Sequence, residues 1–380
     1  MGELGTIIGG ATPSTKKAEN YDSGTISWIT PKDLAGFSGR FISRGERNIT
    51  EQGLKSCSTQ LMPAHTVLFS SRAPIGYAAI AAQDICTNQG FKSVVPNDST
   101  DYMFLYYLLK YNRDKIENLG SGTTFKEVSG STMRGIEVTV PESIEEQRRI
   151  ASVLSALDDK IENNTEVNKN LFEQAQALYK DRYIDLSPFY GKIPDGWHIG
   201  TVSEIIELHD SKRIPLSSRE RANLAKIYPY YGATSVMDYV DRYLFDGIYL
   251  LLGEDGTVVD SKGFPILQYV EGKFWVNNHA HIITGKNGFT VETLYLLFSL
   301  TNVQSIVTGA VQPKISQTNM NKVPVVIPSK AELSDFDSIV QPIFAQIRNL
   351  RVENDRLTTT RDTLLPRLMS GELDVSDLDL

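Results

Sequence analysis

The sequence predicts an α/β protein built from two similar globular domains that are separated by two long helices. The stretch SALDDKIENNTEVNKNLFEQAQALYK, from Ser155 to Lys180, contains no glycine or proline and lies at the middle of the chain. A second stretch with a similar pattern ends the chain, and the sequence outside these two stretches repeats itself. With 380 residues the chain is long enough for two domains.

The two halves of the chain align without a gap over their most similar stretch. GTTFKEVSGSTMRGIEVTVP ends at Pro141 and GAVQPKISQTNMNKVPVVIP ends at Pro328, at an offset of 187 residues. Val138 and Val140 alternate with polar residues as in a strand, and the matching residues of the second half do the same. Segments 87–95 and 276–284 also correspond, as do the short apolar helices expected at 102–110 and 293–300. A unit duplicated once gives the chain an internal pseudo-twofold repeat.

The two long helices each carry a narrow apolar stripe whose spacing alternates between four and three residues, which is a heptad pattern. The first stripe comprises Ile150, Leu154, Leu157, Ile161, Asn164, Asn168, Leu171, Ala175 and Leu178. The second comprises Phe336, Val340, Ile343, Ile347, Leu350, Asn354, Leu357, Arg361, Leu364 and Leu368. Because a lone helix with so narrow a stripe is marginal in water, we predict that the two helices pair as a coiled coil in which the asparagines set the register. The alternative is that each helix packs only on its own globular domain.

The predicted boundaries place the first domain at 1–142, the first helix at 143–185, the second domain at 186–329 and the second helix at 330–380. The formal net charge is −8, and seven of the eight excess negative charges lie in the two helical segments. An acidic chain by itself argues weakly against a nucleic-acid partner. The two domains are nearly neutral, however, so each could carry a local basic face.

The lack of a membrane helix and of a secretory signal in the sequence predicts a cytoplasmic protein. No apolar run approaches the ~18 residues that a membrane helix needs. The N-terminal MGELGTIIGG lacks the basic region and long apolar stretch of a secretory signal. Cys57 and Cys86 suit a reducing compartment, where both are expected to be small buried side chains.

No motif of a known catalytic site is present in the sequence. GGATPSTKK lacks the order of a phosphate-binding loop, and GEDGTVV (253–259) lacks the spacing of a calcium loop. His279 and His281 would share one face of a strand, but no further ligands complete a zinc site. No two prolines are adjacent, so the Asn/Asp-Pro-Pro-aromatic motif of amino-methyltransferases is missing. We therefore predict a binding protein with no catalytic residue, no metal and no cofactor of its own.

Polar and basic residues in the predicted loops are the candidates for DNA contact, because Asn, Gln and Arg read base edges while Lys and Thr hold phosphates. The candidates are Arg72, Asn88, Gln89, Lys92, Thr124 and Lys126 in the first half, and Asn277, Asn278, His279, Gln312 and Lys314 in the second. The commoner use of Asn and Gln in loops is to hydrogen-bond the loop backbone, and this alternative stays open.

Several stretches together resemble one family. GSGTTFKEVSGSTMRGIEVTVP leading into EEQRRIASVLSALDDKI, YPYYGATSVMDYVDRYLFDG, and LRVENDRLTTTRDTLLPRLMSGELDV are similar to the specificity subunits of type I restriction–modification systems. The resemblance covers nearly the whole chain and both halves.

The resemblance implies that each domain is a target recognition domain around a small, strongly twisted sheet, and that each reads one half of a split DNA site. It implies that the two helices form an antiparallel coiled coil that sets the unread gap. It further implies two methyltransferase subunits, which methylate adenine N6 on a flipped base with S-adenosylmethionine, and restriction subunits that translocate DNA. S-adenosylmethionine, ATP and Mg are then expected on the partner subunits only.

The first half departs from this pattern at its start. The second domain opens with GKIPDGWHIGTVSEII (191–206), and if Glu204 matches Glu3, the lead-in that holds Trp197 has no counterpart in the first half. Two other classes of function stay open at this point. One is a protein-only scaffold without DNA specificity, and the other is a self-contained nuclease or methyltransferase.

Overall fold

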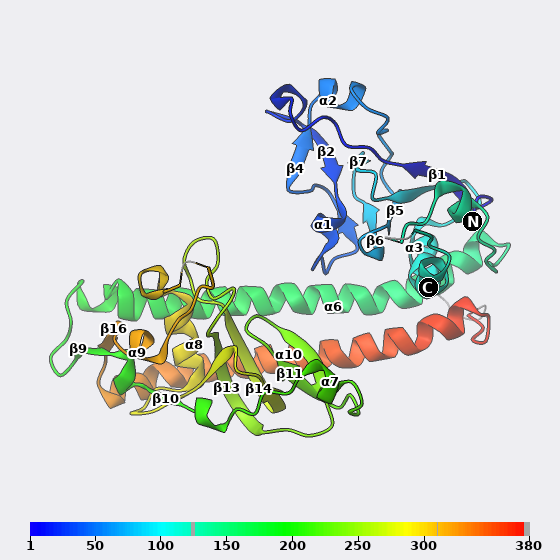
Figure 1. Ribbon diagram of the computed structural model, residues 1–380. Coiled ribbons are helices and arrows are strands. Elements are labelled where there is room, and N and C mark those ends of the chain that lie inside the picture. The colour runs from blue at the N-terminus through cyan, green and yellow to red at the C-terminus, as the bar shows by residue number, and fades with distance from the viewer. Residues whose placement is uncertain (123–125, 310, 376–380) are drawn as a thin grey trace. The chain divides into compact units, whose positions relative to one another are not determined.

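The computed structural model describes residues 1–122, 126–309 and 311–375, and the chain divides into two compact units (Figure 1). The first unit comprises Met1–Thr165 and Arg351–Leu380, and the second comprises Glu166–Leu350. Each unit therefore contains one globular domain and one half of each long helix. Within the described ranges, no helix is both long and apolar enough to cross a membrane.

The domain of the first unit is built on a five-stranded sheet of order β1–β8–β5–β6–β3. These strands are β1 (Gly5–Gly9), β8 (Lys92–Pro96), β5 (Val67–Ser71), β6 (Ile75–Ala81) and β3 (Phe41–Ile42). A three-stranded sheet of order β4–β2–β7 consists of β4 (Arg47–Ile49), β2 (Ile26–Ile29) and β7 (Cys86–Thr87). The helices are α1 (Pro31–Leu34), α2 (Glu51–Lys55), α3 (Tyr102–Tyr111), α4 (Arg113–Asn118) and α5 (Gly130–Arg134).

The central strand β5 is buried on both faces, which explains why it is apolar without alternation. Val67 and Phe69 join the core that contains α3, whereas Leu68 joins a second core with Ile29 and Phe91. Helix α3 begins where the Asp101 carboxylate accepts the Phe104 amide at 2.9 Å, a standard N-cap. The sheet is therefore held between two hydrophobic cores.

The domain of the second unit repeats this plan with longer strands. Its six-stranded sheet has the order β10–β15–β13–β14–β11–β12, and β16 and β9 form a separate pair. The strands are β10 (Ile206–Leu208), β15 (Ala280–Gly285), β13 (Phe245–Gly253), β14 (Leu267–Val276), β11 (Tyr228–Tyr231), β12 (Val236–Val240), β16 (Pro324–Ile327) and β9 (His198–Thr201). The helices are α7 (Ser218–Arg221), α8 (Val291–Ser299) and α9 (Gln317–Met320). The prediction of an α/β protein with two similar domains is confirmed.

The long helices are α6 (Ile144–Tyr179) and α10 (Lys330–Met369), and they pair antiparallel within each unit. In the first unit Asp158 contacts Arg361 and Asn164 contacts Asn354. In the second unit the ring of Phe172 lies 6.3 Å from that of Phe344, and Tyr179 lies 5.9 Å from Phe336. Residues later in α6 therefore contact residues earlier in α10, as in any antiparallel pair of helices.

The same helices also pack on the domains, so the two packing modes weighed from the sequence coexist. Leu154 of α6 and Leu368 of α10 belong to the core that contains α3. Ala175 of α6 and Val340 of α10 belong to the core that contains α8. Each half-helix therefore buries apolar surface against its partner helix and against a domain.

Burial differs among the predicted seam residues. Ile150, Leu154, Asn164, Val340, Ile347 and Leu350 are buried, while Leu157, Ile161, Asn168, Leu171, Ile343, Asn354, Leu357 and Leu364 are half-buried. Leu178 is wrong as a seam residue, because it is 41% exposed and the next residue, Tyr179, is buried instead. A straight α-helix repeats every 3.6 residues, so its buried stripe drifts from a strict heptad. This drift also explains why Asp158 is more deeply buried than Leu157.

Polar side chains within the first unit fix how α6 meets α10 and the domain. The Asp158 carboxylate accepts the Tyr107 hydroxyl at 2.6 Å and the Arg361 guanidinium at 2.6 Å. Asn164, which is 1% exposed, donates to the Asn354 side-chain oxygen at 2.9 Å. A shift of either helix would leave these groups buried without partners, and that penalty favours one register.

We expect Asp158→Ala to destabilise the first unit by about 3 kcal/mol, because it leaves a partly buried arginine and a buried tyrosine hydroxyl without their shared acceptor. Thermal unfolding followed by calorimetry measures this loss. Glu145→Ala is the matched control, since its ion pair with Arg148 at 2.8 Å is exposed and should contribute less than about 1 kcal/mol. Equal losses in the two variants would contradict the role assigned to Asp158.

Candidate nucleic-acid interface

The central strand of each domain ends in a loop that carries charged residues. In the first unit β5 ends at Ser71 and Arg72 follows, and the Ser71 carbonyl accepts the Val128 amide at 3.0 Å. In the second unit β13 is followed by Glu254, whose carbonyl accepts the Ile315 amide at 2.9 Å. The two loops therefore occupy equivalent places.

An asparagine turn lies next to this loop in both units. The side-chain oxygen of Asn88 accepts the Gly90 amide at 2.8 Å, and that of Asn277 accepts the His279 amide at 2.8 Å. The carbonyl of Gly90 then accepts the Ser71 amide at 2.7 Å, just as the carbonyl of His279 accepts the Glu254 amide at 2.8 Å. Equivalent backbone hydrogen bonds therefore join the turns 88–90 and 277–279 to the strand-end loops.

In each unit a short hairpin lies next to the strand-end loop and the asparagine turn. Ser121 and Glu127 exchange two backbone hydrogen bonds of 3.0 and 2.9 Å, and Thr308 and Lys314 exchange two of 2.9 and 2.7 Å. The hairpin of the first unit also bridges to Arg72, and that of the second unit bridges to Asp255. Three loops thus meet in each unit, although 55 residues of chain separate Arg72 from Glu127.

A fourth segment belongs to each set and was missed from the sequence. The Asn88 amide donates to the Ile29 carbonyl at 2.9 Å, and the Asn277 amide donates to the Tyr231 carbonyl at 3.0 Å. The segments after β2 and after β11, 30–33 and 232–235, therefore border the asparagine turns. The family-like stretch YPYYGATS contains the second of them, but nothing in its composition marks it as a contact surface.

In the first unit two of the candidate side chains lie beside one carboxylate. Arg72 lies 3.5 Å and Lys92 lies 3.3 Å from Glu127, which is the end of the hairpin. Gln89 is exposed and accepts a hydrogen bond from the Thr12 hydroxyl, and Lys126 is exposed. Thr124 lies outside the described residues. The first unit therefore presents Arg72, Gln89 and Lys126 on one connected group of loops, with Lys92 beside them at the start of β8, while the side-chain oxygen of Asn88 is used by its own turn.

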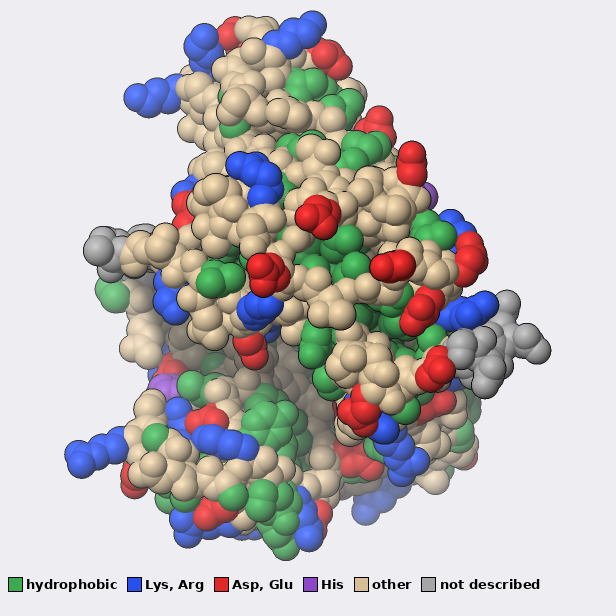
Figure 2. All heavy atoms as spheres, turned by 90° about the vertical axis from the view of Figure 1, so that its right-hand side faces the viewer, with side chains coloured by type: hydrophobic (Ala, Val, Ile, Leu, Met, Phe, Trp, Pro, Cys, Tyr) green, Lys and Arg blue, Asp and Glu red, His purple; other side chains and the backbone are tan. Residues whose placement is uncertain are grey.

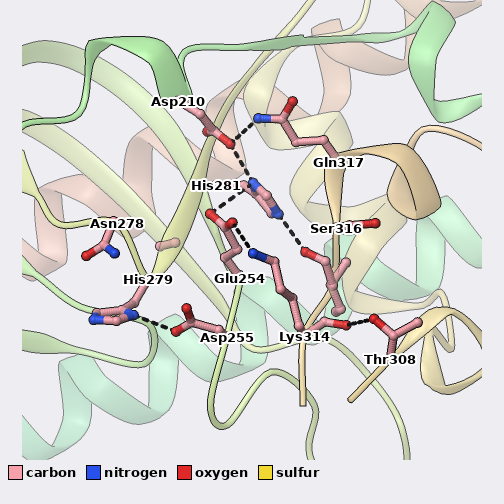
Figure 3. Close-up of polar contacts among 12 residues, drawn as sticks. Asp210, Glu254, Asp255, Asn278, His279, His281, Thr308, Lys314, Ser316 and Gln317 are labelled. Carbon is pink, nitrogen blue, oxygen red and sulfur yellow. Dashed lines mark hydrogen bonds and ion pairs between the residues drawn. The ribbon is translucent and has the colours of Figure 1, made fainter. Parts of the chain in front are cut away.

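In the second unit a buried ionic cluster takes the corresponding place (Figure 3). His281 is 1% exposed, and its two ring nitrogens lie 2.6 Å from the Asp210 carboxylate and 2.8 Å from the Ile315 carbonyl. The His281 ring is therefore hydrogen-bonded on both sides. Glu254 lies 2.6 Å from Arg213 and 3.1 Å from Lys314.

The two carboxylates of this cluster stay ionised. Burial alone would raise the pKa of the Asp210 carboxyl, but hydrogen bonds from His281, the Ile282 amide and Gln317 outweigh it and lower this pKa. Burial likewise acts to raise the pKa of Glu254, and Arg213, His281 and Lys314 together lower it. Asp210, Glu254 and His281 lie close enough to hold a cation, with ligand atoms within 4.8 Å of one another. Because both ring nitrogens of His281 are already in hydrogen bonds and two basic side chains lie beside Glu254, this set fits a polar network rather than a metal site.

The other candidates of the second unit lie around this cluster. His279 is 2.5 Å from Asp255, and Asn278 and Gln312 are exposed. Asn277 is buried, with its oxygen used by the turn and its amide nitrogen 3.2 Å from the Met237 sulfur. The exposed polar groups that can meet a ligand are thus Asn278, His279, Gln312 and Lys314, and the buried Asn277 shapes the loop that carries two of them.

Comparisons with known proteins agree with this duplicated arrangement. The family described as type I restriction modification DNA specificity domain matches residues 1–172 and 194–357, which is one match for each half. The chain belongs to this family.

The type I restriction enzyme MjaIX specificity subunit of Methanocaldococcus jannaschii is 35% identical over 406 aligned positions, covering 99% of this chain and 93% of that protein. The EcoR124I/EcoR124II specificity subunit of Escherichia coli is 29% identical over 193 positions, covering 49% and 46%. The crystal structure of a type I restriction–modification S subunit from M. genitalium aligns with a TM-score of 0.56 at 20% identity, covering 97% of this chain and 94% of that one, and so shares the fold.

The Asp210 network predicts a defined dependence of stability on pH. Since the pKa of Asp210 is lower in the folded protein than its ordinary value of 3.8, ionisation stabilises the fold fully above pH 3.8 and less as the pH falls below it. We expect Asp210→Asn to destabilise the second unit by about 3 kcal/mol at pH 6 and by clearly less near pH 3. Asp241→Asn is the control, because Asp241 pairs with the neighbouring exposed Arg242. Thermal unfolding across this pH range measures both, and a pH-independent loss in Asp210→Asn would contradict the network.

Proposed function

We propose that this protein is the DNA sequence-specificity subunit of a type I restriction–modification complex and that it reads a bipartite DNA site. The observation that carries the proposal is the duplicated set of loops. Each unit joins a strand-end loop, an asparagine turn and a hairpin through the same backbone hydrogen bonds, while the exposed side chains on them differ. Two equivalent scaffolds with different side chains suit the reading of two different half-sites.

The chemistry of the exposed side chains supports a role of these loops in binding DNA. Lys126 and Lys314 are exposed cations suited to phosphate oxygens, and Lys314 lies beside Glu254. Gln89, Asn278 and Gln312 are exposed amides, which can donate to and accept from a base edge at the same time. We infer that Asn88 and Asn277 act indirectly, because both hold their turns in shape. The protein-only scaffold considered from the sequence has no structural feature in its favour.

We further infer that the chain catalyses no reaction and works with two methyltransferase subunits and with restriction subunits. Adenine N6 methylation and DNA cleavage would be activities of that complex, with S-adenosylmethionine, ATP and Mg bound by the partner subunits. Methylation of a base inside a duplex requires the base to be flipped out, which the partner would do once the loops have fixed the register. The antiparallel pairing of α6 and α10 within each unit is suited to holding the unread gap constant.

Sequencing that detects methylated adenine, in cells that co-express this chain with its methyltransferase, tests the proposal. We expect methylation within a two-part motif that has a fixed unread gap. Gln89→Ala should relax one half of this motif, and Gln312→Ala should relax only the other, by about 1–3 kcal/mol per lost base contact. Gln52→Ala, an exposed glutamine on α2, serves as the control and should leave the motif intact. A stable complex that methylates without sequence preference would refute the proposal.

The phosphate contact proposed for Lys126 has its own signature. We expect Lys126→Ala to weaken DNA binding by the methyltransferase complex uniformly across sequences and to reduce the slope of log affinity against log salt by about 1. Lys160→Ala is the charge-matched control, since Lys160 lies on α6 within 3.7 Å of Glu353. Fluorescence anisotropy at several salt concentrations measures the slope. An unchanged slope in Lys126→Ala would remove Lys126 from the interface.

A further inference from the structure

The turn that joins β11 to β12 lies against both the asparagine turn and the strand-end loop of the second unit. Residues 232–235 form this turn, which the Gly232 amide closes by donating to the Ser235 carbonyl at 2.8 Å. A Cβ atom placed on Gly253, the last residue of β13, would lie 3.4 Å from the Ala233 carbonyl oxygen, so the turn packs where the strand-end loop begins. It therefore belongs to the same group of loops as the exposed polar candidates of the second unit.

The surface of this turn is exposed and uncharged. Thr234, Ser235, Val236 and Met237 are all exposed, and segment 227–237 contains no Asp, Glu, Lys or Arg. Met237 is 56% exposed. Figure 2 shows the second unit from the end at which Figure 1 places α7, and apolar side chains lie on the surface there. The polar candidates thus have an exposed apolar side chain beside them.

The Met237 side chain is held in place although more than half of it is exposed. The Asn277 side-chain amide donates to the Met237 sulfur at 3.2 Å, and the oxygen of the same side chain accepts the His279 amide at 2.8 Å. A Cβ atom on Gly232 would overlap the Met237 sulfur, so the glycine leaves room for it. A hydrogen bond to sulfur is weak, but together with this packing it restricts a side chain that is otherwise flexible. Met237 therefore presents a defined apolar surface that loses little conformational freedom on binding.

The chemistry of this surface fits one group on the edge of a DNA base pair. In the major groove thymine presents a C5 methyl group, whereas the other edge groups are hydrogen-bond donors or acceptors. An apolar side chain beside exposed amides therefore matches an A·T pair, and a charged side chain would suit a phosphate better. A protein partner is the alternative. The exposed hydroxyl groups of Thr234 and Ser235 and the exposed amide of Asn278 favour DNA over an apolar protein surface.

The first unit has no such side chain in the corresponding segment. Residues 30–33 carry Lys32, which lies 2.7 Å from Glu46, and Asp33, whose carboxylate accepts the Thr30 amide at 2.7 Å. This segment is therefore charged where that of the second unit is apolar. An apolar base contact would belong to one half-site only, as expected if the two units read different sequences.

We propose that Met237 contacts the C5 methyl group of one thymine in the half-site that the second unit reads, and so selects an A·T pair at that position. The inference rests on the proposed function and adds to it a specificity-determining residue that the sequence did not single out. The contact removes apolar surface from water. Burial of one such carbon contributes about 0.8 kcal/mol, which is about fourfold in affinity.

Binding to duplexes in which deoxyuridine replaces single thymines tests the proposal, because deoxyuridine lacks only the methyl group. Each duplex carries the two-part motif, and the second half-site is the half that Gln312→Ala relaxes. The complex of this chain with its methyltransferase is titrated in a competition assay followed by fluorescence anisotropy. We expect one thymine of the second half-site whose replacement weakens binding about fourfold. Replacements in the unread gap are the control on the DNA and should leave binding unchanged.

Variants of the protein assign this effect to Met237. Met237→Ala should weaken binding to the thymine duplex and remove the difference between thymine and deoxyuridine at that position. Met237→Leu keeps an apolar side chain and should keep the difference, which separates the contact from a loss of fold. Ile227→Ala is the matched control, since Ile227 is 58% exposed and lies at the other end of the same hairpin, where its amide donates to the Val240 carbonyl. It should discriminate as the unchanged protein does.

The possible failures can be told apart. If no thymine of the second half-site is sensitive, or if the sensitivity persists in Met237→Ala, the Met237 contact is overturned while the proposed function stands. A complex that binds all sequences equally overturns both. If Met237→Ala lowers the affinity for the methyltransferase and leaves thymine discrimination intact, the turn docks a protein subunit, and the base contact is overturned as well.

Discussion

The constraint on which the rest of the structure depends is that neither long helix can bury its narrow apolar stripe alone. In each unit, half of α6 and half of α10 bury their stripes against one another and against a domain core. Leu154 and Leu368 do so beside α3, and Ala175 and Val340 do so beside α8. Buried polar groups such as Asp158 and Asn164 then make one register more favourable than its neighbours, because a shift would leave them unpaired.

Backbone hydrogen bonds fix the arrangement of the loops, so the side chains that the loops carry can differ between the two units. The same hydrogen bonds join the strand end, the asparagine turn and the hairpin in both units. Yet Lys92 in the first unit takes the place that His281 takes in the second, and Glu127 takes the place of Lys314. One scaffold can therefore carry different recognition surfaces, which is what a reader of two unlike half-sites requires.

The sequence by itself determined the duplication, the two long helices, the alternating strand pattern of 325–327 and the absence of familiar catalytic motifs, because these depend on local periodicity and residue type. It also indicated the loops that carry Asn88 and Asn277, because asparagine is common in turns. Only the tertiary structure decided that Asn277 is buried in its turn, that Tyr179 rather than Leu178 is buried, and that Asp210 meets His281 across 71 residues of chain. The reason is physical: burial and ionic contact are set by which distant segments meet, and a single sequence records periodicity but not those meetings.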